Sequence, residues 1–186
     1  MGKGGIFVIS GPSGAGKNTV YDGLCARSGD FAQTVSATTR APRAGEQDGV
    51  DYYFKSADEF RKLVDAGEFI EYVNYGGNYY GTLKSEVARL ADMGKKVVLV
   101  IEVNGAFNIK KAFPEAVLLF IMPPSVEELE RRIRKRGDNT EEETAERIRI
   151  AEEEMRCRDR YDHCVVNDEL DECVNNVYNI IMSKGE

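Results

Sequence analysis

The chain has 186 residues, 31% of them charged, and a formal net charge of −7 at pH 7. This length suits one domain, or one core with inserted subdomains, and the composition is ordinary for a globular protein. The negative charge argues against a general electrostatic attraction to nucleic acid or to an anionic membrane, so neither is expected as a partner. A phosphate ligand must then be held by local groups of arginine, lysine and backbone N–H.

Sequence signals for membrane insertion, export and zinc binding are missing. No apolar run reaches the ~20 residues of a membrane-spanning helix, and the first five residues lead into an apolar segment without a cleavage pattern. The four cysteines form no CxxC pair and there is one histidine, which argues against a zinc site. We therefore expect reduced thiols in a cytoplasmic protein, and no pattern specifies an oligomeric state.

The apolar segments predict an α/β fold with a parallel core sheet flanked by helices. Ile6–Ile9 is the first expected strand, followed by a glycine-rich turn and a helix over about Lys17–Arg27. Further buried strands are expected at residues 97–101, 116–121 and 164–166, with helical patterns between them. The strand that begins at Val97 is expected to run on to Val103. Alternating strands and helices with continuous apolar strands indicate a parallel sheet covered on both faces.

Three helix starts carry the capping-box pattern, in which a hydroxyl residue is followed three positions later by glutamate. These hydroxyl residues are Ser56, Ser125 and Thr140. On the helix after Ser125, Glu128 and Glu130 stand four positions before arginines, a spacing that favours ion pairs.

Two segments interrupt the α/β rhythm. Residues 36–82 are rich in tyrosine, glycine and arginine, and predict an inserted substrate subdomain with short, partly exposed strands. Residues 135–149 are charged and predict a lid. The core of a single domain covering residues 1–186 then comprises residues 1–35, 83–134 and 150–186.

The first turn has the composition of a phosphate-binding loop. Its glycines let backbone N–H groups converge on phosphate oxygens, the following helix adds its positive dipole end, and the lysine reaches the outer phosphates. Asn18 stands where the strict motif has serine or threonine, and the hydroxyl comes one residue later. A plain glycine-rich turn with a surface lysine is the alternative. The loop comprises Gly11, Pro12, Ser13, Gly14, Ala15, Gly16, Lys17, Asn18 and Thr19.

Further motifs follow the loop in a characteristic order. Thr-Thr-Arg-Ala-Pro-Arg occupies residues 38–43, and Gly-Asn-Tyr-Tyr-Gly occupies residues 77–81. Matching segments also occur at residues 51–54, 69–72, 123–125, 135–137 and 165–168. With these motifs, the sequence resembles the guanylate kinases over nearly its whole length.

The resemblance implies a fold of the P-loop NTPase type with a GMP-binding insertion and a lid. It implies transfer of the terminal phosphoryl group of ATP to GMP, with Mg²⁺ as cofactor and ATP and GMP as the small-molecule substrates. The implied GMP contacts are Ser36, Arg40, Arg43, Tyr52, Glu71, Tyr80, Thr82 and Glu102. On the ATP side the resemblance adds to the loop Arg132, Arg136 and Asn167. The implied catalytic residues are Lys17, Arg40, Arg43, Arg136 and Arg147.

The residue types fit a nucleoside monophosphate independently of the resemblance. Arg40 and Arg43 can fork the oxygens of a phosphate, and Tyr52 and Tyr80 can add hydroxyl donors. Guanine differs from adenine by donors at N1 and N2, for which a carboxylate is the matching acceptor. Glu71 and Glu102 are the candidate carboxylates. The alternatives are a solvated arginine pair and a partly exposed glutamate at a strand end.

Metal handling is the point at which this sequence departs from many guanylate kinases. Those relatives carry a carboxylate two residues before the position of Glu102, where this chain has Val100. We therefore expect Mg²⁺ to be held mainly by nucleotide phosphates, with Thr19 or Asn18 as the candidate protein ligands. Two other functions stay open at this point. One is a guanylate-kinase-like module that binds GMP or a protein without turnover, and the other is a kinase of another nucleotide or of a phosphoribose.

Overall fold

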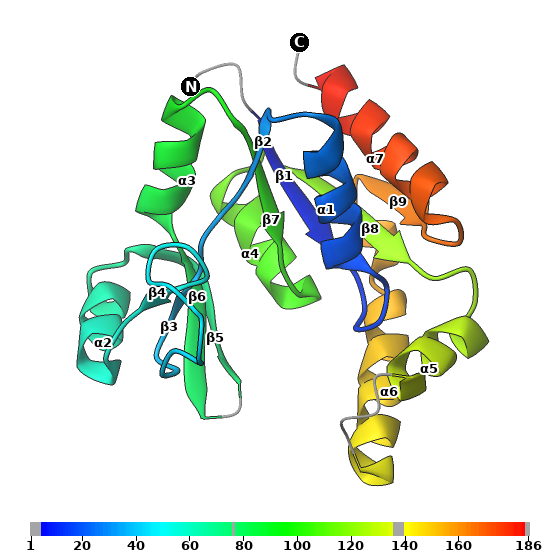
Figure 1. Cartoon of the computed structure of the whole chain (residues 1–186), viewed down its shortest axis with the longest axis horizontal. Coiled ribbons are helices and arrows are strands. Elements are labelled where there is room, and N and C mark those ends of the chain that lie inside the picture. Colours follow the sequence, from blue (N-terminus) through cyan, green and yellow to red (C-terminus); the bar gives the residue numbers. More distant parts are fainter. Residues whose placement is uncertain (1–4, 76, 136–139, 185–186) are drawn as a thin grey trace.

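The computed structural model describes residues 5–75, 77–135 and 140–184 (Figure 1). A parallel five-stranded sheet forms the core, with strand order β2-β7-β1-β8-β9. Because β1 lies between β7 and β8, the loop that leaves its carboxyl end opens at the centre of the sheet edge. The strands are β1 Ile6–Ser10, β2 Phe31–Gln33, β7 Lys96–Val100, β8 Val117–Met122 and β9 His163–Val166.

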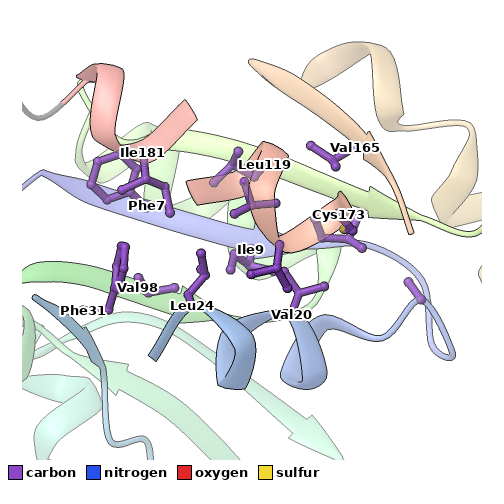
Figure 2. Packing of buried hydrophobic residues seen from close by; sticks show 14 residues of the cluster. Phe7, Ile9, Val20, Leu24, Phe31, Val98, Leu119, Val165, Cys173 and Ile181 are labelled. Atoms are coloured by element: carbon purple, nitrogen blue, oxygen red, sulfur yellow. The ribbon is translucent and has the colours of Figure 1, made fainter. Parts of the chain in front are cut away.

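Both faces of this sheet are buried, as continuous apolar strands require. Alternate side chains of β1 enter opposite clusters: Phe7 and Ile9 face one, Ile6 and Val8 the other. Helices α1 (Lys17–Arg27) and α7 (Leu170–Lys184) cover the first cluster, which Figure 2 shows in close-up. Helices α3 (Lys84–Asp92) and α4 (Val103–Ala112) cover the second. The predicted α/β core with helices on both faces is confirmed.

A second, mixed sheet is formed by the segment that was predicted to be an inserted subdomain. Its strand order is β4-β3-β6-β5, with β3 and β4 parallel and the other two pairings antiparallel. Helix α2 (Ala57–Asp65) covers it through Phe60, whose ring stacks on Phe69 with centroids 4.3 Å apart. The strands are β3 Ala37–Thr38, β4 Tyr53–Phe54, β5 Phe69–Tyr75 and β6 Asn78–Leu83.

Two helices project from the other end of the core (Figure 1). Helix α5 (Val126–Lys135) and helix α6 (Glu141–Met155) pack through a small apolar cluster that includes Leu129 and Ile148. Helix α6 continues without interruption past residue 149, where the sequence placed the end of the lid. A short 3₁₀ turn, Arg158–Arg160, then leads to β9. None of the helices in the described ranges is long and apolar enough to cross a membrane.

The capping boxes at Ser56 and Thr140 are confirmed, with both reciprocal hydrogen bonds in place. Ser125 accepts a hydrogen bond from the N–H of Glu128 (3.2 Å), while the Glu128 carboxylate pairs with Arg131 and Arg132. The predicted Glu128–Arg132 pair is therefore present. Arg134, by contrast, pairs with Glu141 from the next helix (2.6 Å).

The strand expected to run to Val103 is shorter than predicted. β7 ends at Val100, Glu102 is the N-cap residue of α4, and Val103 is the first residue of that helix. The apolar sequence continues because Val103 and Ala106 bury the first turn of α4 against the same core. An unbroken apolar run thus conceals a change from strand to helix.

Candidate active site

The glycine-rich loop joins the carboxyl end of β1 to the start of α1. Gly11, Gly14 and Gly16 have positive φ angles of 142°, 85° and 89°, which favour glycine. A Cβ atom at Gly11 would clash with the backbone oxygen of Ile121, and one at Gly16 would clash with the side-chain amide of Asn167. Packing and backbone conformation therefore both require glycine at these two positions. The loop thus brings backbone N–H groups to the N-terminus of α1, and helix N-termini bind anions.

Lys17 folds back over this loop. Its ammonium group donates to the carbonyl oxygen of Gly11 (2.6 Å) and lies 3.4 Å from both carboxylate oxygens of Glu102. The Lys17 side chain is only 12% exposed, whereas that of Glu102 is 65% exposed. The lysine is thus held at the mouth of the loop, and Glu102 reaches it from the start of α4.

Glu154 is a member of the site that the sequence did not indicate. Burial and, after it, the nearby charge of Glu102 together raise the pKa of this carboxyl to about 7, against the opposing effects of Lys17 and the Ser13 N–H. Helix α6 therefore brings a second carboxylate to the mouth of the loop. In the acidic sequence around Glu154, nothing distinguishes this half-buried glutamate from Glu153, which is exposed.

Asn167 supports the loop from the end of β9. Its side-chain amide donates to the carbonyl oxygen of Ala15 (2.8 Å), and only 6% of the residue is exposed. Arg132 donates to the Asn167 carbonyl oxygen (3.0 Å) while it pairs with Glu128 (2.7 Å). Arg132 and Asn167 are thus brought to the loop, and the expected contact of Asn167 with the ATP base stays a prediction.

Arg40 lies near the second sheet, among aromatic and acidic side chains. Its guanidinium pairs with Glu46 (2.7 Å) and lies 5.3 Å from the ring centroid of Tyr52. The Tyr52 ring in turn lies 6.0 Å from that of Tyr80. Glu46 also accepts from the N–H of Arg43 (2.7 Å), so one carboxylate organises the loop that carries both arginines. Sequence reasoning did not identify this role of Glu46.

Glu71 on β5 and Thr82 on β6 are paired across the two antiparallel strands. The Thr82 hydroxyl is fully buried and donates to a carboxylate oxygen of Glu71 (2.8 Å). Burial raises the pKa of Glu71, and the hydrogen bonds from Thr82 oppose this effect. A Cβ atom placed on Gly105 of α4 would lie 3.4 Å from Glu71, so this carboxylate faces the core near Glu102. The two predicted guanine acceptors therefore come from different elements, Glu71 from β5 and Glu102 from the start of α4.

The remaining predicted residues are dispersed around this region. Asn18 and Thr19 are exposed in the first turn of α1, and Arg147 is half-buried on α6. Arg136 lies outside the described residues. Within the described ranges, no group of three or more His, Cys, Asp or Glu side chains is placed to hold a metal ion.

The family model for guanylate kinase matches residues 3–184 of this chain. A guanylate kinase of Caldanaerobacter subterraneus is 44% identical over 98% of this chain and 88% of its own length. The chain belongs to the guanylate kinase family. A guanylate kinase of Clostridium tetani is 45% identical over 99% of this chain and 88% of its own length.

A solved guanylate kinase structure from Anaplasma phagocytophilum has the same fold. It is 36% identical to this chain, covers 98% of it and 86% of its own chain, and superimposes with a TM-score of 0.75. A sugar kinase from Janibacter is only 15% identical, with a TM-score of 0.51, and supports the fold alone. As a guanylate kinase family member, the chain is an ATP:GMP phosphotransferase.

Proposed function

We propose that the chain phosphorylates GMP between the loop of residues 11–19 and the insertion of residues 36–82. The observation that supports this most directly is the position of Lys17, held at the loop mouth 3.4 Å from Glu102. Lys17 would bind the outer phosphates of ATP, and Glu102 would lie on the side of GMP. In this arrangement the donor phosphate would lie next to the acceptor.

In this proposal, guanine is recognised by Glu71 and Glu102, with Ser36 and Thr82 as hydroxyl partners. A carboxylate accepts the N1 and N2 donors of guanine, which adenine lacks. The hydrogen bond from Thr82 to Glu71 supports the assignment, because it orients the Glu71 carboxylate. The GMP phosphate would be bound by Arg40 and Arg43, with Tyr52 and Tyr80 as hydroxyl donors.

Phosphoryl transfer would depend on positioning and charge neutralisation. The acceptor oxygen is already anionic, so no side-chain base is needed. Arg136 and Arg147 would approach the moving phosphoryl group when the lid, residues 135–149, closes and excludes water. The α5–α6 pair supports this assignment, because its buried apolar residues form a small cluster of their own, separate from the core clusters.

The residues near the loop fit Mg²⁺ bound mainly through nucleotide phosphates. Asn18 and Thr19 present an amide oxygen and a hydroxyl beside Lys17, and Mg²⁺ prefers oxygen ligands while keeping several waters. When bound, the ion neutralises charge on the β- and γ-phosphates. Val100, in contrast, is half-buried and packs against the apolar cluster of Figure 2.

We further propose a cytoplasmic enzyme with small-molecule substrates only. The experiment that tests the function is ADP release with GMP, AMP, UMP or CMP as acceptor. Turnover with GMP and at most traces with the other three is the expected result. GMP binding without ADP release would instead identify a binding module, and preference for another acceptor would reject the guanine site.

A further inference from the structure

Two segments of chain connect the core sheet to the second sheet. Residues 34–36 lead from β2 into β3, and α3 follows β6 directly on the return path (Figure 1). Glu86 lies in the first turn of α3, at this junction, and its side chain is only 2% exposed. An almost completely buried carboxylate at such a joint requires an explanation, because burial of a charge is costly.

The contacts of Glu86 join three separate elements. One carboxylate oxygen accepts from the backbone N–H of Val35 (3.2 Å), in the first connection between the sheets. The other accepts from the hydroxyl of Tyr53 on β4 (3.0 Å). Arg89, one turn further along α3, donates to both oxygens (2.9 and 3.0 Å). A single side chain thus holds both connections and the edge strand of the second sheet together.

Each held segment carries a residue of the proposed GMP pocket. Val35 directly precedes Ser36, and Tyr53 directly follows Tyr52. The two segments also bond to each other, since the N–H of Tyr53 donates to the carbonyl oxygen of Ser36 (2.9 Å). A shift of either segment would therefore move a group assigned to guanine or to its phosphate.

The electrostatics show that these donors stabilise the charged form of Glu86. Burial alone would raise its pKa, but hydrogen bonds from Arg89, Val35 and Tyr53 outweigh burial and lower it. An ion pair with Arg89 alone would need no burial, because helix pairs three residues apart form readily on surfaces. The buried position is stable only while donors from all three elements stay in place.

We propose that Glu86 is a positioning residue for GMP, which acts through Val35 and Tyr53 to hold Ser36 and Tyr52 in their binding positions. Glu86 itself does not contact the nucleotide. The proposal rests on the proposed assignment of Ser36 and Tyr52 to the GMP pocket. Under this proposal, the buried ion pair at the junction of the two sheets affects the binding of GMP and not that of ATP.

Steady-state kinetics of Glu86→Gln is the central test. This variant keeps the size of the side chain but loses the charge and one acceptor. We expect KM for GMP to rise about tenfold, the effect of weakening hydrogen bonds to a buried charge, with KM for ATP unchanged. Asp58→Asn, which removes the exposed ion pair to Arg61 on α2, is the matched control and should change neither KM.

Hydrogen exchange of the free protein reports on the junction without nucleotide. The amide of Val35 should exchange faster in Glu86→Gln than in the wild type, while amides of the core strand β1 should not change. If Val35 exchanges no faster, or if both KM values rise by the same factor, the proposal is overturned.

Two further variants separate the possible failures. Tyr53→Phe removes a single donor and preserves the ion pair, so it should fold normally and raise KM for GMP by a smaller factor. Ser36→Ala tests the pocket itself. A raised KM for GMP in Ser36→Ala with no change in Glu86→Gln rejects only the role of Glu86, whereas no change in either variant also rejects the proposed pocket.

Discussion

The ammonium group of Lys17 and the carboxylate of Glu102 lie 3.4 Å apart, although they come from α1 and from the start of α4. In the proposed function the first residue serves ATP and the second serves GMP. The pair therefore marks the place at which the two substrates meet. Under this proposal, phosphates bound at the loop would compete with Glu102 for Lys17, which would free the carboxylate for the acceptor nucleotide.

Replacement of Lys17 by alanine should lower kcat about 10²–10³-fold, the usual effect of removing a preorganised charge from a transferring phosphoryl group. KM for GMP should stay close to the wild-type value, because the residues assigned to GMP, apart from Glu102, do not contact Lys17. ADP release at saturating substrates measures the effect. Lys111→Ala, an exposed lysine on α4, is the control, and an unchanged kcat in Lys17→Ala would contradict the assignment of the loop.

Replacement of Glu71 by glutamine should lower kcat/KM for GMP by about 10–10²-fold, because a guanine donor would then face an amide N–H₂ group. The wild type should prefer GMP to AMP by ~10⁴–10⁵, and the variant by much less. Glu68→Gln, an exposed glutamate that directly precedes β5, is the control. Equal use of AMP and GMP by the wild type would reject the guanine site.

Glu71 should also determine the acid limb of the pH profile. Burial raises its pKa, so protonation of the free enzyme begins at a higher pH than for an exposed glutamate. Since only the charged form accepts from guanine, kcat/KM for GMP should fall as the pH decreases through this raised pKa. The profile of Glu71→Gln should lack this limb, and an identical limb in both proteins would assign it to another group.

Glu154 predicts a second, opposite pH effect, on stability. Its folded-state pKa is about 7, above the ordinary value of 4.5, so the folded protein binds this proton more tightly than the unfolded chain. The resulting stabilisation is complete below pH 4.5 and is lost as the pH rises through 7. Relative to Glu154→Gln, the wild type should therefore become less stable between these limits.

The measurement is a pair of thermal melts at pH 5 and pH 8 without nucleotide. Part of the Glu154 carboxylate faces water, which weakens the effect, so we expect the Tm difference between the two proteins to change by about 2–4 °C. Glu152→Gln, on the same helix, should show no such change. A constant Tm difference at both pH values would contradict the raised pKa.

The sequence predicted best those helices and strands whose ends are marked by local signals, such as turn residues. Helix α1 runs from Lys17 to Arg27 as expected, because the glycine-rich loop precedes it and Ser28 and Gly29 follow. Strand β2 and the start of α4 carry no such signal. The apolar run from Val97 to Val103 is typical of one strand, but the backbone at Ile101 and Glu102 separates strand from helix.

The residues of the site also differ in how well the sequence predicted them. Residues within short motifs, such as Lys17 and Arg40, could be predicted, because their neighbours in sequence are also their neighbours in space. Glu46, Glu86 and Glu154 could not, since their role depends on partners brought by tertiary structure. Glu86 in particular looks like an ordinary helical glutamate paired with an arginine three residues later.

Val100→Glu introduces a carboxylate at the position where many relatives have one, and tests its effect on stability and on the Mg²⁺ requirement. Val100 is half-buried at the end of β7 and packs against the apolar cluster formed by β1, α1 and α7. A carboxylate there loses apolar contacts and part of its hydration, so the free energy of unfolding should fall by about 1–3 kcal/mol. For a chain of this size, that corresponds to a loss of several degrees in Tm.

A second outcome follows if the longer side chain bends toward the loop. Mg²⁺ bound with ATP would then gain a carboxylate within reach of its waters, and the Mg²⁺ concentration at half-maximal rate should fall. Val100→Gln is the matched control, because it has the same shape without the charge. A Mg²⁺ titration at fixed ATP, combined with thermal melts of all three proteins, separates the two effects. If Val100→Glu melts with the wild type and requires the same Mg²⁺ concentration, both the packing and the metal argument at this position are wrong.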